Sequence, residues 1–186
     1  MGHSRVEKAA SRERVLRVAS RKVRESGLAG PGVAEIMQEA GLTHGGFYKH
    51  FASRDDLIAQ AAAAALTERP VEVEELAGMG EQDRYAGLVD SYLGREHRDS
   101  PGTGCALVTL GAAAGRGDQA LKEAYEKRVR GYLDLLGGND SEEARAEAMI
   151  TLSALVGATL IARAVADRTL SDEVLETVAR QLTGHC

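Results

Sequence analysis

The chain has 186 residues, with 23 Lys and Arg against 28 Asp and Glu, and its formal net charge is −5. Aromatic residues make up only 4% and there are three prolines, a composition that favours helices and leaves little material for a β-sheet. No segment reaches the ~18 consecutive apolar residues of a membrane span, and the amino terminus lacks the apolar core of a signal peptide. We therefore expect a cytoplasmic protein with no membrane partner.

The two cysteines, Cys105 and Cys186, lie far apart in the sequence. They give neither a disulfide framework nor the ligand spacing of a zinc site. We expect no metal and no cofactor.

Charge is distributed unevenly along the chain. Residues 1–54 contain ten Lys and Arg against five Asp and Glu, whereas the remainder contains 13 against 23. A basic head on an acidic body is typical of nucleic-acid-binding proteins. The alternative interpretation is an ordinary solvated helix face, and the charge alone does not decide between the two.

The first predicted helix covers residues 4–26 and ends at Gly27. An apolar stripe at helical spacing predicts its buried face, formed by Val15, Val18, Ala19 and Val23. Basic residues off this stripe are available to phosphates, namely Arg12, Arg14, Arg21 and Lys22.

Residues 33–57 predict two short helices joined by a tight turn. The first ends at Ala40, Gly41 suits a left-handed terminating residue, and Thr43 suits the N-cap of the second. Two short helices with a glycine in the turn are typical of a helix-turn-helix that binds DNA.

The second of these segments separates its residues by face. Phe47 and Phe51, four residues apart, are expected to point into a core, while Gly45 and Lys49 fall on the opposite face. Small residues allow the backbone to approach base edges, and a long donor can then contact them. Flanking this face are Tyr48 and His50, which are placed to reach phosphates.

The segment GLTHGGFYKHFASRDDLI, residues 41–58, resembles the recognition region of TetR/AcrR-family transcriptional repressors. Tyr48, His50 and Phe51 match the family's Tyr-x-His-Phe core, and the strong resemblance covers roughly residues 11–66. One departure is the absence of a Ser or Thr cap in residues 29–33. The resemblance and the helical positions of these residues together predict the DNA contacts. They are Thr43, His44, Gly45, Gly46, Tyr48, Lys49, His50 and Arg54.

The resemblance implies a ligand-responsive repressor that binds a palindromic operator as a dimer. We expect an all-α fold of about nine helices, with a three-helix DNA-binding domain at residues 1–57. A ligand-binding and dimerisation domain follows at 58–186, and a helix at 53–69, opened by a capping box at Ser53, links the two.

Within the body, residues 71–80 predict an acidic loop, and residues 100–104 a strong break. Apolar periodicity and capping residues predict helices at 82–97, 105–114, 118–136 and 141–167, and a last helix opened by Ser171.

The last two helices have apolar faces wider than one neighbour covers. A two-fold four-helix bundle between protomers would bury them, and burial inside one protomer is the alternative. The residues expected at the dimer interface are Ala148, Leu152, Leu155, Thr159, Val174, Val178 and Leu182.

A small-molecule effector is expected to bind among the earlier body helices. The candidates combine apolar lining with polar groups, namely Tyr92, His97, Cys105, Tyr125 and Met149. Each also has an ordinary structural explanation: tyrosines at helical spacing are often core, a methionine often fills a gap, and a histidine at a helix end is often solvated.

Two further functions remain open. Cys105 is either a buried inert thiol or an electrophile sensor, since its Gly-Cys placement is similar to a branch of the family that senses through a cysteine. A helical protein-interaction module without DNA binding is the other alternative. We expect no enzyme activity, because Cys105 with His97 is the only thiol–imidazole candidate and no third group supports it.

Overall fold

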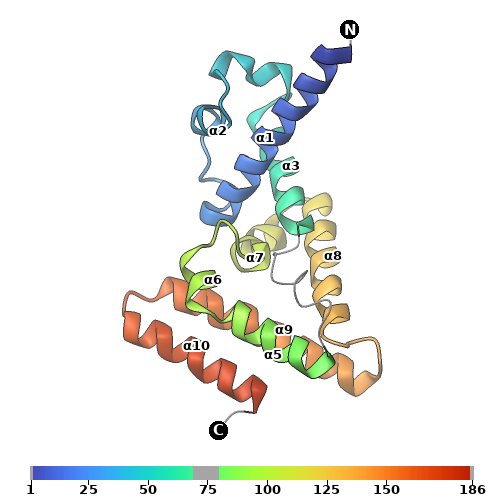
Figure 1. Cartoon of the computed structure of the whole chain (residues 1–186), viewed down its shortest axis with the longest axis vertical. Helices are drawn as coiled ribbons and strands as arrows, with labels where there is room; N and C mark the ends of the chain where they lie inside the picture. Colours follow the sequence, from blue (N-terminus) through green and yellow to red (C-terminus); the bar gives the residue numbers. More distant parts are fainter. Residues whose placement is uncertain (1, 69–79, 185–186) are drawn as a thin grey trace.

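The computed structural model describes residues 2–68 and 80–184, and every regular element in these two ranges is helical (Figure 1). The expected all-α class is confirmed. The acidic loop expected at 71–80 falls outside the described residues except for Gly80. The elements are α1 Gly2–Ser26, α2 Val33–Glu39, the 3-10 helix η1 His44–Lys49, α3 Arg54–Thr67, α5 Glu81–Tyr92, α6 Arg95–Asp99, α7 Ala106–Arg116, α8 Gln119–Leu135, α9 Glu142–Ala164 and α10 Arg168–Thr183.

The amino-terminal end of the molecule is a small helical head made by α1, α2 and η1 (Figure 1). Gly27 and Gly41 adopt φ values of +72° and +73°, and so end α1 and α2 in the left-handed conformation that glycine adopts at little cost. The stripe expected on α1 lies on the inner side of the helix, which packs against α2 and α3. The buried residues of this small core include Val15, Ala19, Val23, Ile36, Met37, Phe47 and Phe51.

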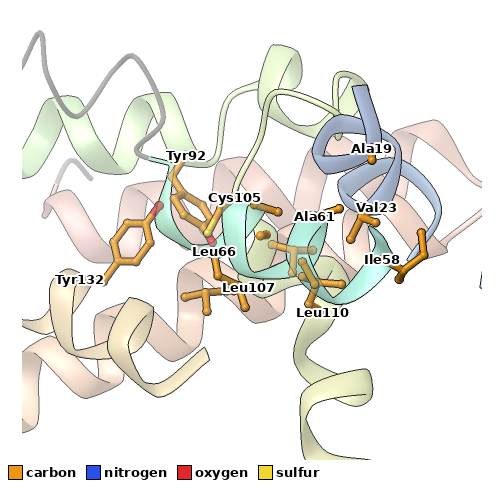
Figure 2. Close-up of a cluster of buried hydrophobic side chains, with 14 of the residues drawn as sticks. Ala19, Val23, Ile58, Ala61, Leu66, Tyr92, Cys105, Leu107, Leu110 and Tyr132 are labelled. Carbon is orange, nitrogen blue, oxygen red and sulfur yellow. The ribbon is translucent and has the colours of Figure 1, made fainter. Parts of the chain in front are cut away.

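Helix α3 joins the head to the body. Its start is fixed by a reciprocal cap: Ser53 Oγ accepts from the Asp56 amide at 3.0 Å, and Asp56 Oδ2 accepts from the Ala52 amide at 3.0 Å. The helix packs against α1 on one side and against α7 and α8 on the other. Figure 2 shows the resulting continuous core, from Val23 on α1 to Leu107 on α7. The predicted domain boundary at residue 57 therefore falls inside one helix.

The helix predicted at 82–97 is wrong in one respect, because two helices occupy that range. Helix α5 ends at Tyr92, and Gly94 caps the short α6. A Cβ on Gly94 would lie 3.0 Å from the Asp90 carbonyl oxygen, so the bend between the helices favours glycine. This bend turns α6 away from α5 and toward α9.

The start of the last helix also differs from the prediction. Asp167 caps α10 by accepting from the Thr169 amide at 2.8 Å. Ser171 lies inside the helix and is buried, and its hydroxyl donates to the Ala162 carbonyl at 2.7 Å. The serine thus holds α10 against α9 instead of opening the helix.

Helix α9 is the long apolar helix of the body. By length and composition it could cross a membrane, a property that it shares with core helices of soluble proteins. One face packs inside the protomer: Ala148, Leu152, Leu155 and Thr159 are all at most 6% exposed. These four residues were expected at the dimer interface, and their burial corrects that prediction.

Candidate nucleic-acid interface and interior cluster

The recognition segment is a 3-10 helix, not the α-helix assumed in the sequence analysis. Gly45 and Gly46 disfavour an α-helix, and only six residues separate the Thr43 cap from His50. The segment closes with an i to i+4 bond from the Phe51 amide to the Phe47 carbonyl at 3.1 Å. That last turn keeps both phenylalanines on one face, with ring centroids 5.8 Å apart.

The opposite side of η1 is open to solvent. Tyr48 is 77% exposed, and Thr43, His44, Gly45 and Lys49 are also exposed. Thr43 occupies the N-cap position, but its side chain makes no capping hydrogen bond. We name the seven residues of 43–50 other than the buried Phe47 the recognition surface.

Internal packing does not explain the two glycines of the recognition surface. A Cβ on Gly45 would meet nothing within 4 Å, and one on Gly46 would make only ordinary contacts at 3.8 Å. Neither glycine has a positive φ. Space inside the protomer therefore does not require glycine at either position.

Arg54 makes contacts that the sequence did not predict. Its Nη2 atom donates to the carbonyls of Leu28, Ala29 and Pro31 at 3.1, 3.1 and 3.2 Å. The side chain thereby fastens the connection between α1 and α2 to the start of α3. A phosphate contact by Arg54 remains a prediction, and the guanidinium has a structural role in any case.

Two of the basic residues on α1 are paired within the head. Arg21 forms an ion pair with Glu39, and Lys22 pairs with Glu35 and Glu39. These contacts join α1 to α2, so they reduce the positive charge that the sequence offered to phosphates.

In the body, four of the five candidate ligand residues lie in or beside one buried group, which we name the interior cluster: Tyr92, His97, Cys105, Tyr125 and Tyr132. His97 Nδ1 donates to the Tyr92 carbonyl at 2.6 Å, and its Nε2 accepts from the Cys105 amide at 2.9 Å. The histidine therefore connects α5, α6 and the start of α7. Its Nε2 binds the cysteine's backbone and not its thiol, so it is not placed as a base for Cys105.

The thiol of Cys105 is 1% exposed and lies close to the phenols of Tyr92 and Tyr132 (Figure 2). The pKa of both tyrosines is raised well above its usual range. Burial is the larger cause, and the neighbouring Cys105 is the next. The Tyr92 hydroxyl is buried without a hydrogen-bond partner among the described residues. Burial also lowers the pKa of His97 to about 4.

Two residues change the predicted ligand set. Met149 is 44% exposed on α9, so it lies away from the interior cluster. Tyr132 belongs to the cluster although it was not predicted there, and its position seven residues after Tyr125 on one face of α8 could have indicated it. The Tyr125 hydroxyl donates to the Leu107 carbonyl at 3.2 Å.

A buried arginine ties the head to the loop beside this cluster. Arg24 of α1 is 9% exposed, and its Nε donates to the Gly102 carbonyl at 2.7 Å. Its Nη1 atom lies 2.7 Å from Glu68 Oε2, and Thr109 of α7 donates to its backbone carbonyl at 2.7 Å. Arg24 therefore joins α1 directly to the 100–104 loop.

The outer face of α9 is apolar and exposed. Its exposed residues are Met149, Ile150, Ser153, Leu160 and Ile161, with the half-buried Gly157 among them and Leu170 exposed nearby at the start of α10. Val174, Val178 and Leu182 are half-buried on α10. An exposed apolar strip of this kind marks an interaction surface.

Residues 15–69 match the family model described as "Bacterial regulatory proteins, tetR family". Comparison with curated protein sequences gives no match.

Several solved structures share the fold over almost the whole chain. A TetR transcriptional regulator from Chloroflexus aurantiacus J-10-FL superposes with a TM-score of 0.75 at 22% identity, covering 96% of this chain and 95% of that one. A TetR-family regulator from Agrobacterium tumefaciens gives 0.75 at 18% identity, covering 95% and 97%. The reduced form of E. coli NemR gives 0.73 at 22% identity, covering 94% and 95%.

At these identities the likeness shows a common fold, while the family model matches the head that carries the recognition surface. The exposed η1, its two glycines and the matched residues all belong to one helix-turn-helix. Residues 15–69 therefore match the DNA-binding domain of TetR-family transcriptional regulators, and the chain as a whole shares the fold of that family.

Proposed function

We propose that the protein is a dimeric repressor that binds a palindromic operator and is released by a small-molecule effector in the cytoplasm. The observation that carries the DNA-binding part is the recognition surface, which is exposed above the buried Phe47 and Phe51. Gly45 and Gly46 let the η1 backbone approach base edges, and Lys49 supplies a donor to them. Tyr48 and His50 bind phosphates on either side of the groove.

The proposed dimer uses the outer face of α9 together with α10. Exposed Ile150, Leu160 and Ile161 supply apolar area, and Gly157 allows close approach because a Cβ there would meet nothing within 4 Å of its own protomer. Two heads separated by one turn of DNA, about 34 Å, would then contact the two halves of a palindrome.

The proposed effector binds at the interior cluster. Tyr92, His97 and Cys105 come from three consecutive segments of chain, so a ligand there would shift α6 and the 100–104 loop relative to one another. Arg24 would pass that shift to α1, which changes the separation of the two heads and lowers operator affinity.

The DNA-binding proposal is tested by selecting duplexes from a random pool and measuring affinity against salt concentration. Binding through phosphates gives a steep decrease of log affinity with log salt. Lys49→Ala should weaken specific binding and relax base preference, whereas Tyr48→Phe should weaken binding to all sequences about equally. A protein that ignores every duplex at low salt would instead be an interaction module. Equal loss of selectivity in both variants would contradict the assigned roles.

A second candidate function is electrophile sensing through Cys105, because its thiol lies between two phenols at the centre of the interior cluster. In a Cys186→Ser background, alkylation with iodoacetamide would add bulk where the core has no room, and should weaken operator binding. The Cys105→Ala variant should not respond to the reagent. An unchanged operator affinity of the alkylated protein would end this candidate.

A further inference from the structure

The amino-terminal part of α1 presents a basic face that lies outside the recognition surface and has no role in the function proposed above. The residues Arg12, Lys8 and Arg5 precede Val15 on α1 at helical spacings of three and four residues. Arg12 therefore lies in line with the buried stripe and not off it, which corrects the sequence-based placement. Arg5 and Lys8 are exposed. Figure 1 shows this end of α1 projecting from the head on the side farthest from the body.

Arg12 fixes where this basic face lies. Its guanidinium carbon is 5.2 Å from the centroid of the Phe51 ring, and its Nη2 atom donates to the Gln60 side chain. The face at Arg12 therefore lies over the carboxyl end of η1. Lys8 lies one turn earlier on α1, and its charge acts on the His50 ring at the edge of the recognition surface.

His50 is surrounded by positive charge. Burial and then Lys8, Arg12 and Lys49, in that order, hold its pKa below the usual value. The charge of Arg12 also acts on the Asp56 carboxylate and helps to lower its pKa. The oxygens of Asp56 already accept hydrogen bonds from the Ala52 amide and the Gln60 side chain.

Only one nitrogen of the His50 ring remains for an outside group. Nδ1 is enclosed without a hydrogen-bond partner among the described residues, which leaves Nε2. A concentration of cations with a spare ring nitrogen fits an anion from outside the protomer.

We propose that Arg5 and Lys8 form, together with Lys49 and His50, a phosphate-binding surface that holds the DNA backbone beside the groove entered by η1. This inference rests on the proposed function, since it extends the DNA contact from the helix-turn-helix to the first turns of α1. The ligand is a backbone phosphodiester, so the contact adds affinity without sequence preference.

The test measures the salt dependence of binding to a selected operator duplex. Each phosphate contact that is lost should flatten the slope of log affinity against log salt by about 0.9. In the proposed dimer each operator contacts two protomers, so the double variant Arg5→Gln/Lys8→Gln removes four phosphate contacts and should flatten the slope by about 3.6, with base preference unchanged. Its hydroxyl-radical footprint should shrink at the outer edge of each half-site.

A matched control removes the same charge far from the head. Lys122→Gln/Lys127→Gln changes two exposed lysines of α8 and should leave the slope unaltered. Arg5→Lys/Lys8→Arg should retain the parent slope, because a cation remains at each position.

The outcomes separate this inference from the proposed function. If the Arg5→Gln/Lys8→Gln protein keeps the parent slope while Lys49→Ala flattens it, the extension is wrong and DNA binding through η1 stands. An equal change in the α8 control would also overturn it, because net charge would then explain the effect. If the parent itself binds no duplex, both proposals fail.

Discussion

The head and the body place their candidate functional groups in opposite environments. Tyr48 on the recognition surface is 77% exposed, whereas Tyr92 in the interior cluster is 5% exposed. The recognition surface lies within eight consecutive residues, while the interior cluster collects side chains from α5, α6, α8 and the start of α7. A ligand of the head can be approached from solvent, and a ligand of the body has to displace or rearrange packed groups.

This difference decides how a substitution acts in each region. In the head, function and stability lie on opposite faces of the same short segment, so neighbouring positions can be changed with separate consequences. In the body, the same side chains both pack and offer polar groups, so a change there affects stability and function together.

The sharpest separation in the head is between Phe47 and Tyr48. Phe47→Ala removes a side chain that is 2% exposed, and should lower the free energy of unfolding by about 3–5 kcal/mol. Tyr48→Ala should change it by less than about 0.5 kcal/mol, yet weaken DNA binding. Urea unfolding at a fixed protomer concentration measures both. Similar losses of stability in the two variants would contradict the division of the segment into two faces.

Burial of His97 in the body should make the free energy of unfolding depend on pH. The folded state keeps His97 neutral, with a pKa of about 4, whereas the unfolded chain takes up the proton near the usual value of 6.5. Because the unfolded state binds more protons in this range, the free energy of unfolding should fall by about 2 kcal/mol from pH 7 to pH 5.

The variants are compared by the slope of the free energy of unfolding against pH, and not by their absolute stability. His97→Gln should remove most of the pH dependence, whatever its cost at pH 7. His44→Gln, at an exposed position of η1, should retain it. An unchanged slope in the His97 variant would show that other groups cause the loss.

The parts of the structure that the sequence predicted well are those set by neighbouring residues. The Asp118 and Ser141 side chains cap α8 and α9 as expected, accepting from the Leu121 and Ala144 amides at 2.9 and 3.1 Å. Gly41 adopts the expected left-handed conformation. These features need only three or four consecutive residues, so no knowledge of the fold is required.

The parts that it missed depend on residues far apart in the chain. Arg54 contacts carbonyls 23 to 26 positions away, and a single sequence gives no indication of them. Helix α9 has apolar residues on several faces, so periodicity could not decide which face lies inside. The packing of α10 and α7 decided it, burying Leu155 and leaving Leu160 exposed.

That correction to α9 gives the smallest but most specific prediction. Gly157 on α9 and Gly131 on α8 are both helical, and a Cβ on either would meet nothing within 4 Å of the protomer. Gly157→Leu and Gly131→Leu should therefore fold alike, and leucine favours a helix over glycine at both positions. If the outer face of α9 is the dimer interface, only Gly157→Leu places bulk between protomers, at a cost of about 1.4 kcal/mol. The dimer dissociation constant should then rise about tenfold in sedimentation equilibrium. Equal dissociation constants for the two variants would move the interface away from this face, and with it the proposed spacing of the two heads on DNA.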